Sequence, residues 1–128
     1  MQQLTLTHAL AVALGAVIGA WLRWLAGVWL HASWSGFPLG TLLVNCVGGL
    51  LIGASLVWFS RHPDEFWRLL FVTGFLGALT TFSAFSLESL QLLHKDQWGL
   101  AAAHALAHVA GGLGCAALGF RVARWVWA

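Results

Sequence analysis

Residues 72–86 read VTGFLGALTTFSAFS, and they lie in the middle of an apolar segment that runs from about Phe66 to Leu93. Two glycines, an adjacent pair of threonines and two serines make this stretch a poor uninterrupted helix. Broken backbone that faces lipid is too costly, so a break at membrane depth must be buried in protein or face a water-filled cavity. We therefore predict a helix that breaks and restarts, with freed backbone groups that can coordinate an ion.

The composition is that of an integral membrane protein. Of the 128 residues, 60% are hydrophobic and 8% are charged, whereas about a quarter of a soluble domain is charged. We predict one domain over residues 1–128, embedded in a lipid bilayer. The net charge of +2 is small and no basic run could follow a phosphate backbone, so we expect no nucleic-acid partner. Many tryptophans lie near segment ends, as in interfacial aromatic belts; they are Trp29, Trp34, Trp58, Trp67, Trp98, Trp125 and Trp127.

Four apolar segments reach about twenty residues, the length that crosses a bilayer core. The predicted helices run over about Ala9–Leu30, Leu39–Phe59, Phe66–Leu93, and Trp98–Phe120 or as far as Trp127. The connections are short, so helices that are neighbours in sequence should be antiparallel neighbours in space. The fold class is therefore all-α, with four transmembrane helices, a broken third helix and both termini on one side.

Glycine spacing predicts close helix packing. Gly15 and Gly19 form one GxxxG motif, Gly49 and Gly53 form another, and glycines cluster at 111–114. Small residues let helices approach each other where lipid provides no hydrophobic drive. Four helices are few to enclose a transport pathway, so a protein of this size that moves a solute should oligomerise.

The Lys/Arg bias across the membrane is weak. Four arginines fall on the side of the termini, whereas Lys95 and Arg23 fall toward the other side. This bias favours cytoplasmic termini only slightly. Insertion in both orientations stays open.

Asn45 lies at mid-depth in the second segment, with Thr41 one turn before it on the same face. A buried amide is costly unless it is hydrogen-bonded. Asn45 could form an interhelical hydrogen bond that stabilises the bundle. Alternatively, its NH2 group, which offers two donors, could contact a permeating anion. The sequence leaves both interpretations open.

Four further side chains are candidates for an ion pathway. Phe82 and Phe85 share a face of the restarted helix, and the positive edge of an aromatic ring can contact an anion. Arg23 and Glu88 are the charges nearest to membrane depth, where ionisable residues are functional candidates. Arg23 could draw anions into a vestibule or extend its side chain to the interface.

His104 and His108 share a face of the last segment, at a spacing that can bind zinc. No Glu follows His104 and no third ligand is evident, so hydrogen bonding along a wet track or at a helix interface is favoured over metal binding. No nucleophile–base pair, metal-ligand set or phosphate loop is visible, so we do not expect an enzyme.

The chain resembles the Fluc (CrcB-type) family of fluoride channels over essentially its whole length. The matching stretches are GAVIGAWLR at 15–23, GTLLVNCVG at 40–48, TGFLGALTTFSAFSLE at 73–88, and the glycine-rich last segment. The third stretch is the most specific. The resemblance implies passive export of toxic fluoride across a bacterial plasma (inner) membrane. It also implies a dual-topology homodimer of antiparallel four-helix subunits with two fluoride pores.

The resemblance also implies residue roles. A structural sodium ion, not transported, would be held on the dimer axis by the backbone carbonyls of Gly77 and Thr80. The fluoride pore would be formed by Asn45, Phe82, Phe85, Thr41, Thr81, Ser83, Glu88, His104, His108 and Arg23. The family commonly has Tyr and Ser where this chain has the two histidines. Because histidine titrates near neutral pH, we hypothesise that protonation of His108 modulates conduction.

Three alternatives stay open from the sequence. A proton-coupled fluoride carrier would use Glu88 or the histidines as the titrating group. A small four-helix multidrug exporter would need a carboxylate in the first helix, and the chain has no acidic residue before Asp64. A structural membrane subunit would use the asparagine, the broken helix and the phenylalanines only for packing.

Overall fold

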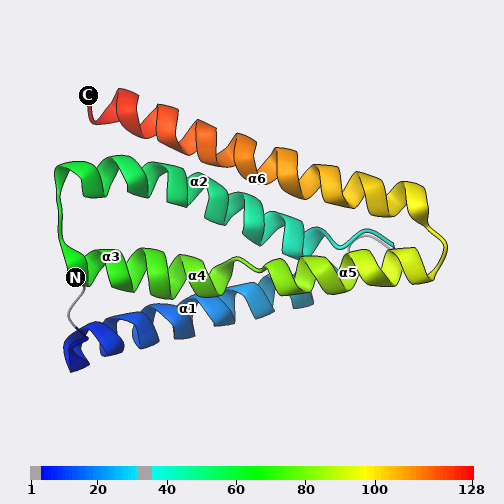
Figure 1. The fold of residues 1–128 in the computed structure, drawn as a ribbon, viewed down its shortest axis with the longest axis horizontal. Helices are drawn as coiled ribbons and strands as arrows, with labels where there is room; N and C mark the ends of the chain where they lie inside the picture. Colours follow the sequence, from blue (N-terminus) through cyan, green and yellow to red (C-terminus); the bar gives the residue numbers. More distant parts are fainter. Residues whose placement is uncertain (1–3, 32–35) are drawn as a thin grey trace.

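Four apolar helical spans make up the described chain (Figure 1). The computed structural model describes residues 4–31 and 36–128, so Trp34 lies outside the described residues. The spans are α1 (Leu6–His31), α2 (Leu39–Arg61), a composite third span (Glu65–His94) and α6 (Trp98–Val126). The four predicted segments are confirmed, and the last one continues almost to its predicted limit.

The third span is built from several short pieces. It consists of α3 (Glu65–Arg68), a π-helical segment η1 (Leu69–Leu76), α4 (Gly77–Leu79) and α5 (Phe82–His94). Between α4 and α5 the chain is extended, with φ/ψ of −83°/155° at Thr80 and −153°/121° at Thr81. The predicted break is thus confirmed and lies at these two threonines. The π-helical segment before the break was not predicted.

The bundle consists of two closely packed helix pairs, α2 with α6 and α1 with the first half of the third span. Figure 1 shows α2 beside α6, and α1 along the first half of the third span, whereas the second half, α5, reaches toward α6. Glycines allow the helix backbones in both pairs to approach each other closely. A Cβ atom at Gly15 would lie 2.0 Å from the Leu70 carbonyl oxygen, and one at Gly53 would lie 2.0 Å from that of Ala116. The packing role predicted for the GxxxG glycines is therefore confirmed at these positions.

Two glycines of the cluster in the last helix behave differently. A Cβ atom at Gly112 or Gly114 would meet nothing within 4 Å in the described chain. These two glycines thus face open space, whereas Gly111 between α6 and α2 would place a Cβ atom 3.0 Å from Cys46 Sγ. The predicted packing role of this glycine cluster is therefore not fulfilled inside the subunit at these two positions.

The two ends of the bundle differ in charge. The start of α1, the end of α6 and the α2–α3 connection lie at one end (Figure 1). Four arginines belong to that end, namely Arg61, Arg68, Arg121 and Arg124. Lys95 follows α5 at the opposite end. The even number of spans thus brings both termini to one side, as predicted.

Candidate functional site

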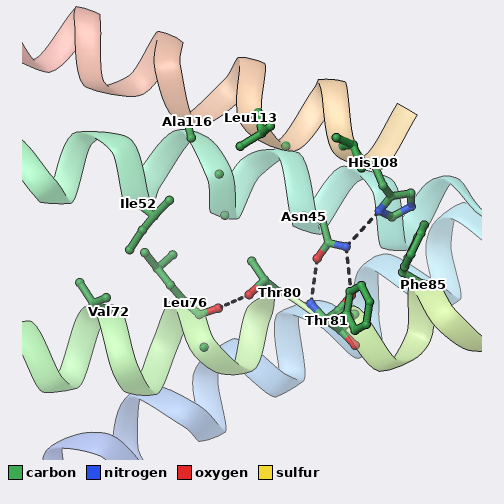
Figure 2. A pocket seen from close by; sticks show the side chains of 16 residues that line it. Asn45, Ile52, Val72, Leu76, Thr80, Thr81, Phe85, His108, Leu113 and Ala116 are labelled. Atoms are coloured by element: carbon green, nitrogen blue, oxygen red, sulfur yellow. Dashed lines mark hydrogen bonds between the residues drawn. The ribbon is translucent and has the colours of Figure 1, made fainter. Parts of the chain in front are cut away.

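Asn45 holds the break in the third span. Its Oδ1 accepts a hydrogen bond from the Thr81 N–H at 2.8 Å, and its Nδ2 donates to the Thr81 carbonyl at 3.0 Å (Figure 2). Thr81 is 7% exposed, so these backbone groups have little access to water. One amide side chain on α2 therefore pairs with both backbone groups of the extended residue.

Asn45 makes a third hydrogen bond. Its Nδ2 also lies 3.2 Å from Nδ1 of His108 on α6. The interhelical hydrogen bond, one of the two interpretations of Asn45 from the sequence, is therefore present in the structure. Both amide hydrogens have protein acceptors in this arrangement, so direct donation to an ion requires that one of these bonds open.

The break frees two backbone carbonyls from their usual donors. In a continuous helix the Thr81 N–H would donate to the Gly77 carbonyl, but it donates to Asn45 instead. The Ala84 N–H would likewise donate to the Thr80 carbonyl, but it donates to the Thr81 hydroxyl at 3.1 Å, which caps α5. Gly77 and Thr80 thus carry the oxygen atoms that hard cations prefer.

Hydroxyl groups continue from the break into α5. The Thr81 hydroxyl lies 3.2 Å from that of Ser83, which is on the exposed side of the helix. The Thr80 hydroxyl instead donates to the Leu76 carbonyl at 2.8 Å, within its own helix. Thr81 and Ser83 therefore form a short hydroxyl pair at the start of α5.

The two candidate phenylalanines share a face of α5, as predicted. Their ring centroids are 5.5 Å apart, but their surroundings differ. Phe82 is 78% exposed, whereas Phe85 is half-buried against two histidine rings. The Phe85 ring stacks on His104 at 5.1 Å between centroids and lies 4.8 Å from His108. Phe85 therefore borders the polar cluster, and Phe82 faces open space.

Glu88 is the centre of a second polar group. The Thr41 hydroxyl donates to its Oε1, and Nε2 of His104 lies 3.2 Å from its Oε2. His104 is fully buried, and its Nδ1 lies 3.1 Å from the Ser89 hydroxyl. Charge-assisted hydrogen bonds of this kind stabilise a carboxylate away from bulk water. Glu88 is therefore held from two helices.

Ser89 was missed from the sequence. It is one of three serines in α5, and its only distinguishing signal was its position next to Glu88. The third member of a histidine–carboxylate cluster was also not anticipated. Glu88, His104 and His108 each place one ligand-type atom within 4.8 Å of the others.

Arg23 does not join this cluster. It lies half-buried on α1. Within residues 4–31 and 36–128, no hydrogen bond or ion pair connects it to the polar residues of α2, α5 and α6. Its role in drawing anions stays a prediction.

The polar groups connect two cavities. An open groove of about 560 Å³ is bordered by Asn45, Thr81, Phe85 and His108. A smaller cavity of about 280 Å³, toward the Lys95 end, is bordered by Thr41, Glu88, Gln91 and Lys95. Buried His104 lies between them, with its ring 4.5 Å from that of His108. The chain therefore has a line of polar side chains through apolar surroundings, from Glu88 through the histidines to Asn45.

Comparison with known proteins identifies relatives over nearly the whole chain. The family model described as "CrcB-like protein, Camphor Resistance (CrcB)" matches residues 10–120. A protein of Aromatoleum aromaticum named "Fluoride-specific ion channel FluC" is 50% identical over 113 residues, which cover 87% of this chain and 86% of the relative. Proteins with the same name are 52% identical in Marinobacter nauticus, over 87% of this chain and 90% of the relative. The protein of that name in Pseudomonas aeruginosa is 47% identical, over 91% of this chain and 94% of the relative.

Proposed function

The chain belongs to the CrcB-like family, and we propose that it is a fluoride-specific ion channel through which cytoplasmic fluoride leaves a bacterial cell passively. The observation that carries this proposal is the line of polar groups that joins two cavities beside the helix break. Its relatives, which match over about nine-tenths of their length, are named fluoride-specific channels. The family is one of channels, so the expectation that the chain is not an enzyme holds.

Fluoride would follow the polar line after losing most of its water. The hydroxyl groups of Thr41, Thr81 and Ser83 can donate to an anion. The edges of Phe82 and Phe85 can contact it in the dry part of the path. Pore width and the placement of donors would then exclude chloride. The remaining residues assigned to the path are Asn45, Glu88, His104, His108 and Arg23.

Glu88 would repel an anion unless its charge is compensated. The Thr41 hydroxyl and the His104 ring both contact its carboxylate. Contacts at both carboxylate oxygens occupy lone pairs of Glu88 and reduce the negative charge that it presents to an anion path.

A second copy of the chain would cover the open groove. Phe82, which is 78% exposed, lines the groove together with Gly77, which is exposed, and Gly112, which leaves open space on α6. Small residues and aromatic side chains on one face suit close association in a membrane. The Lys/Arg excess at the end of the termini is small, four arginines against Lys95 and Arg23, so it would allow insertion in both orientations and an antiparallel pair with dual topology. Such a homodimer would have two pores, one along the polar line of each subunit.

A structural sodium ion on the dimer axis fits the residues at the break. The carbonyl oxygens of Gly77 and Thr80 have lost their helical donors to Asn45 and to the cap of α5. These neutral oxygen ligands would come from both copies and hold an ion that is not transported. The ion would supply positive charge that joins the two broken helices. Asn45 would keep the Gly77 carbonyl free by accepting from the Thr81 N–H, and the Thr81 hydroxyl would keep the Thr80 carbonyl free by accepting from the Ala84 N–H.

The experiment is fluoride efflux from liposomes that contain the purified protein, followed with a fluoride electrode and with chloride efflux as the control. We expect fluoride release without chloride release. Phe82→Ile and Phe85→Ile should each lower the fluoride flux while the dimer stays assembled. Normal flux in both variants would contradict the assigned pore, and the absence of fluoride release from the wild type would contradict the function.

The proton-coupled alternative makes a different prediction. A carrier would move fluoride when a pH gradient is imposed without a fluoride gradient. A channel would respond only to the electrochemical gradient of fluoride itself. The multidrug-exporter alternative is excluded, because the chain belongs to a different family and has no acidic residue in α1.

A further inference from the structure

The orientation of the Asn45 amide is fixed by the backbone of Thr81. The Thr81 N–H requires an acceptor, which is Oδ1, and the Thr81 carbonyl requires a donor, which is Nδ2. A flipped amide would place donor against donor and acceptor against acceptor. The group that Asn45 directs at His108 is therefore the NH2 group.

This orientation fixes the tautomer of His108. Nδ1 lies 3.2 Å from the Asn45 NH2 group and must accept its hydrogen. A neutral imidazole has one donor nitrogen and one acceptor nitrogen. The ring hydrogen of His108 is therefore on Nε2. Protonation of the ring would add a hydrogen at Nδ1 directly against the amide, so this contact opposes it.

The Nε2–H group of His108 has no acceptor. The nitrogen is buried, and no described residue makes a hydrogen bond to it. Its surroundings are Phe85, whose ring centroid is 4.8 Å from that of His108, and His104, at 4.5 Å. Glu88 on α5 is the charged group of the same cluster. A buried donor without a partner is costly, which indicates that an occupant supplies the acceptor.

The tautomer determines the charge of this occupant. A metal ion at the cluster of Glu88, His104 and His108 would need a lone pair on Nε2 of His108. Asn45 denies that lone pair, because it keeps the hydrogen on Nε2. A hydrogen-bond acceptor fits instead. Water and the permeating anion are the acceptors small enough to enter, and the charged one forms the stronger hydrogen bond with an N–H donor.

We propose that the Nε2–H group of His108 is a fluoride ligand in the buried middle of the path, and that Asn45 is a positioning residue that fixes the donor tautomer. This inference rests on the proposed function. In this inference Asn45 acts on fluoride indirectly, because it determines which nitrogen of the His108 ring carries the hydrogen that contacts the ion. It also replaces the hypothesis of pH control with a histidine that stays neutral while it conducts.

The direct test is solid-state NMR of the full-length, histidine-¹⁵N-labelled protein in lipid bilayers. The His108 signals are assigned by difference from His108→Gln. We expect an unprotonated Nδ1, a protonated Nε2, and ¹⁹F-dependent dephasing of the Nε2 signal on addition of fluoride. A protonated Nδ1 would overturn the tautomer. Contact of Nε2–H with water alone at saturating fluoride would overturn the ligand role.

The flux test removes the donor and then restores one. We expect His108→Leu to lower fluoride efflux at least tenfold, and His108→Gln, whose amide can donate, to recover most of it. His94→Gln, at the exposed end of α5, is the matched control and should leave the flux unchanged. Equal flux in His108→Leu and the wild type would refute the role of His108. If the wild type itself releases no fluoride, the proposed function fails. If the wild type and His108→Leu release fluoride equally, only the role of His108 fails, so the two failures are distinguishable.

Zinc tests the positioning role of Asn45. In Asn45→Asp one carboxylate oxygen accepts from the Thr81 N–H and the other from Nδ1–H of His108, which moves the lone pair to Nε2. The same change leaves the Thr81 carbonyl without its donor and against a carboxylate oxygen, so the variant is compared with the wild type only after its folding has been checked. We expect Zn²⁺ to bind Asn45→Asp but not the wild type, as measured by competition with a chromophoric chelator. The ¹⁵N pattern of His108 should reverse in the variant. Zinc binding by the wild type through His104 and His108, or an unchanged ¹⁵N pattern in Asn45→Asp, would contradict the mechanism.

Discussion

Replacing Asn45 with alanine removes the partner of both backbone groups of Thr81. These two hydrogen bonds are 2.8 and 3.0 Å long, and Thr81 is 7% exposed. A buried backbone group without a partner costs about 1–3 kcal/mol. Two such groups should lower the free energy of unfolding by about 2–6 kcal/mol.

The assay is unfolding in mixed micelles with rising SDS, followed by tryptophan fluorescence. The matched control is Val47→Ala on the same helix. The Val47 side chain is 40% exposed, so its truncation should cost less than about 1 kcal/mol.

The same variant separates the two roles that the sequence left open for Asn45. If Asn45 clamps the break, Asn45→Ala should lose both stability and fluoride flux. If Asn45→Ala unfolds within about 0.5 kcal/mol of the wild type and yet loses its flux, Asn45 acts on the ion and not on the backbone. That result would refute the clamp.

Three further outcomes are expected. Gly53→Leu should prevent α2 from packing on α6, because a Cβ atom there meets a carbonyl oxygen at 2.0 Å; gel filtration should show aggregation, whereas Gly99→Leu, where space is open, should remain monodisperse. Thr41→Val removes a donor to the Glu88 carboxylate and should lower the free energy of unfolding by about 1.5–3 kcal/mol in the SDS assay; an unchanged value would show that Glu88 does not depend on it. Fluoride efflux between pH 5.5 and 8 should have the same profile in the wild type and in His108→Ser, since the Asn45 amide directed at Nδ1 opposes protonation of the ring. A profile that flattens in the variant would restore the hypothesis of pH control.

Much of the architecture could be predicted because it depends on local composition. Long apolar segments specify the spans, and the weak helix formers in the run from Gly77 to Ser83 favour a break within the third one. The exact position of the break could not be predicted. It depends on Asn45, which is 36 residues away from Thr81 in sequence and selects the residue whose backbone it pairs with.

The site was only partly predictable for the same reason. The spacing of His104 and His108 is visible in the sequence, but their relation to Glu88 depends on how α5 meets α6. The tautomer of His108 depends on three spans at once, because Asn45 on α2 must bind both Thr81 at the break of the third span and His108 on α6. No local pattern contains that information.

The π-helical segment η1 has a consequence for everything that follows it. A π-helix places more residues in each turn than an α-helix does, so the chain arrives at the threonines with a different rotational phase from that of a regular helix. Shortening η1 by one residue would turn the next helix by about 100°. Phe85 and Glu88 would then swing away from α6, although neither of them had been altered. The alignment of the conduit is thus set a full turn or more upstream, by a winding irregularity in a stretch whose only polar side chain is that of Thr73.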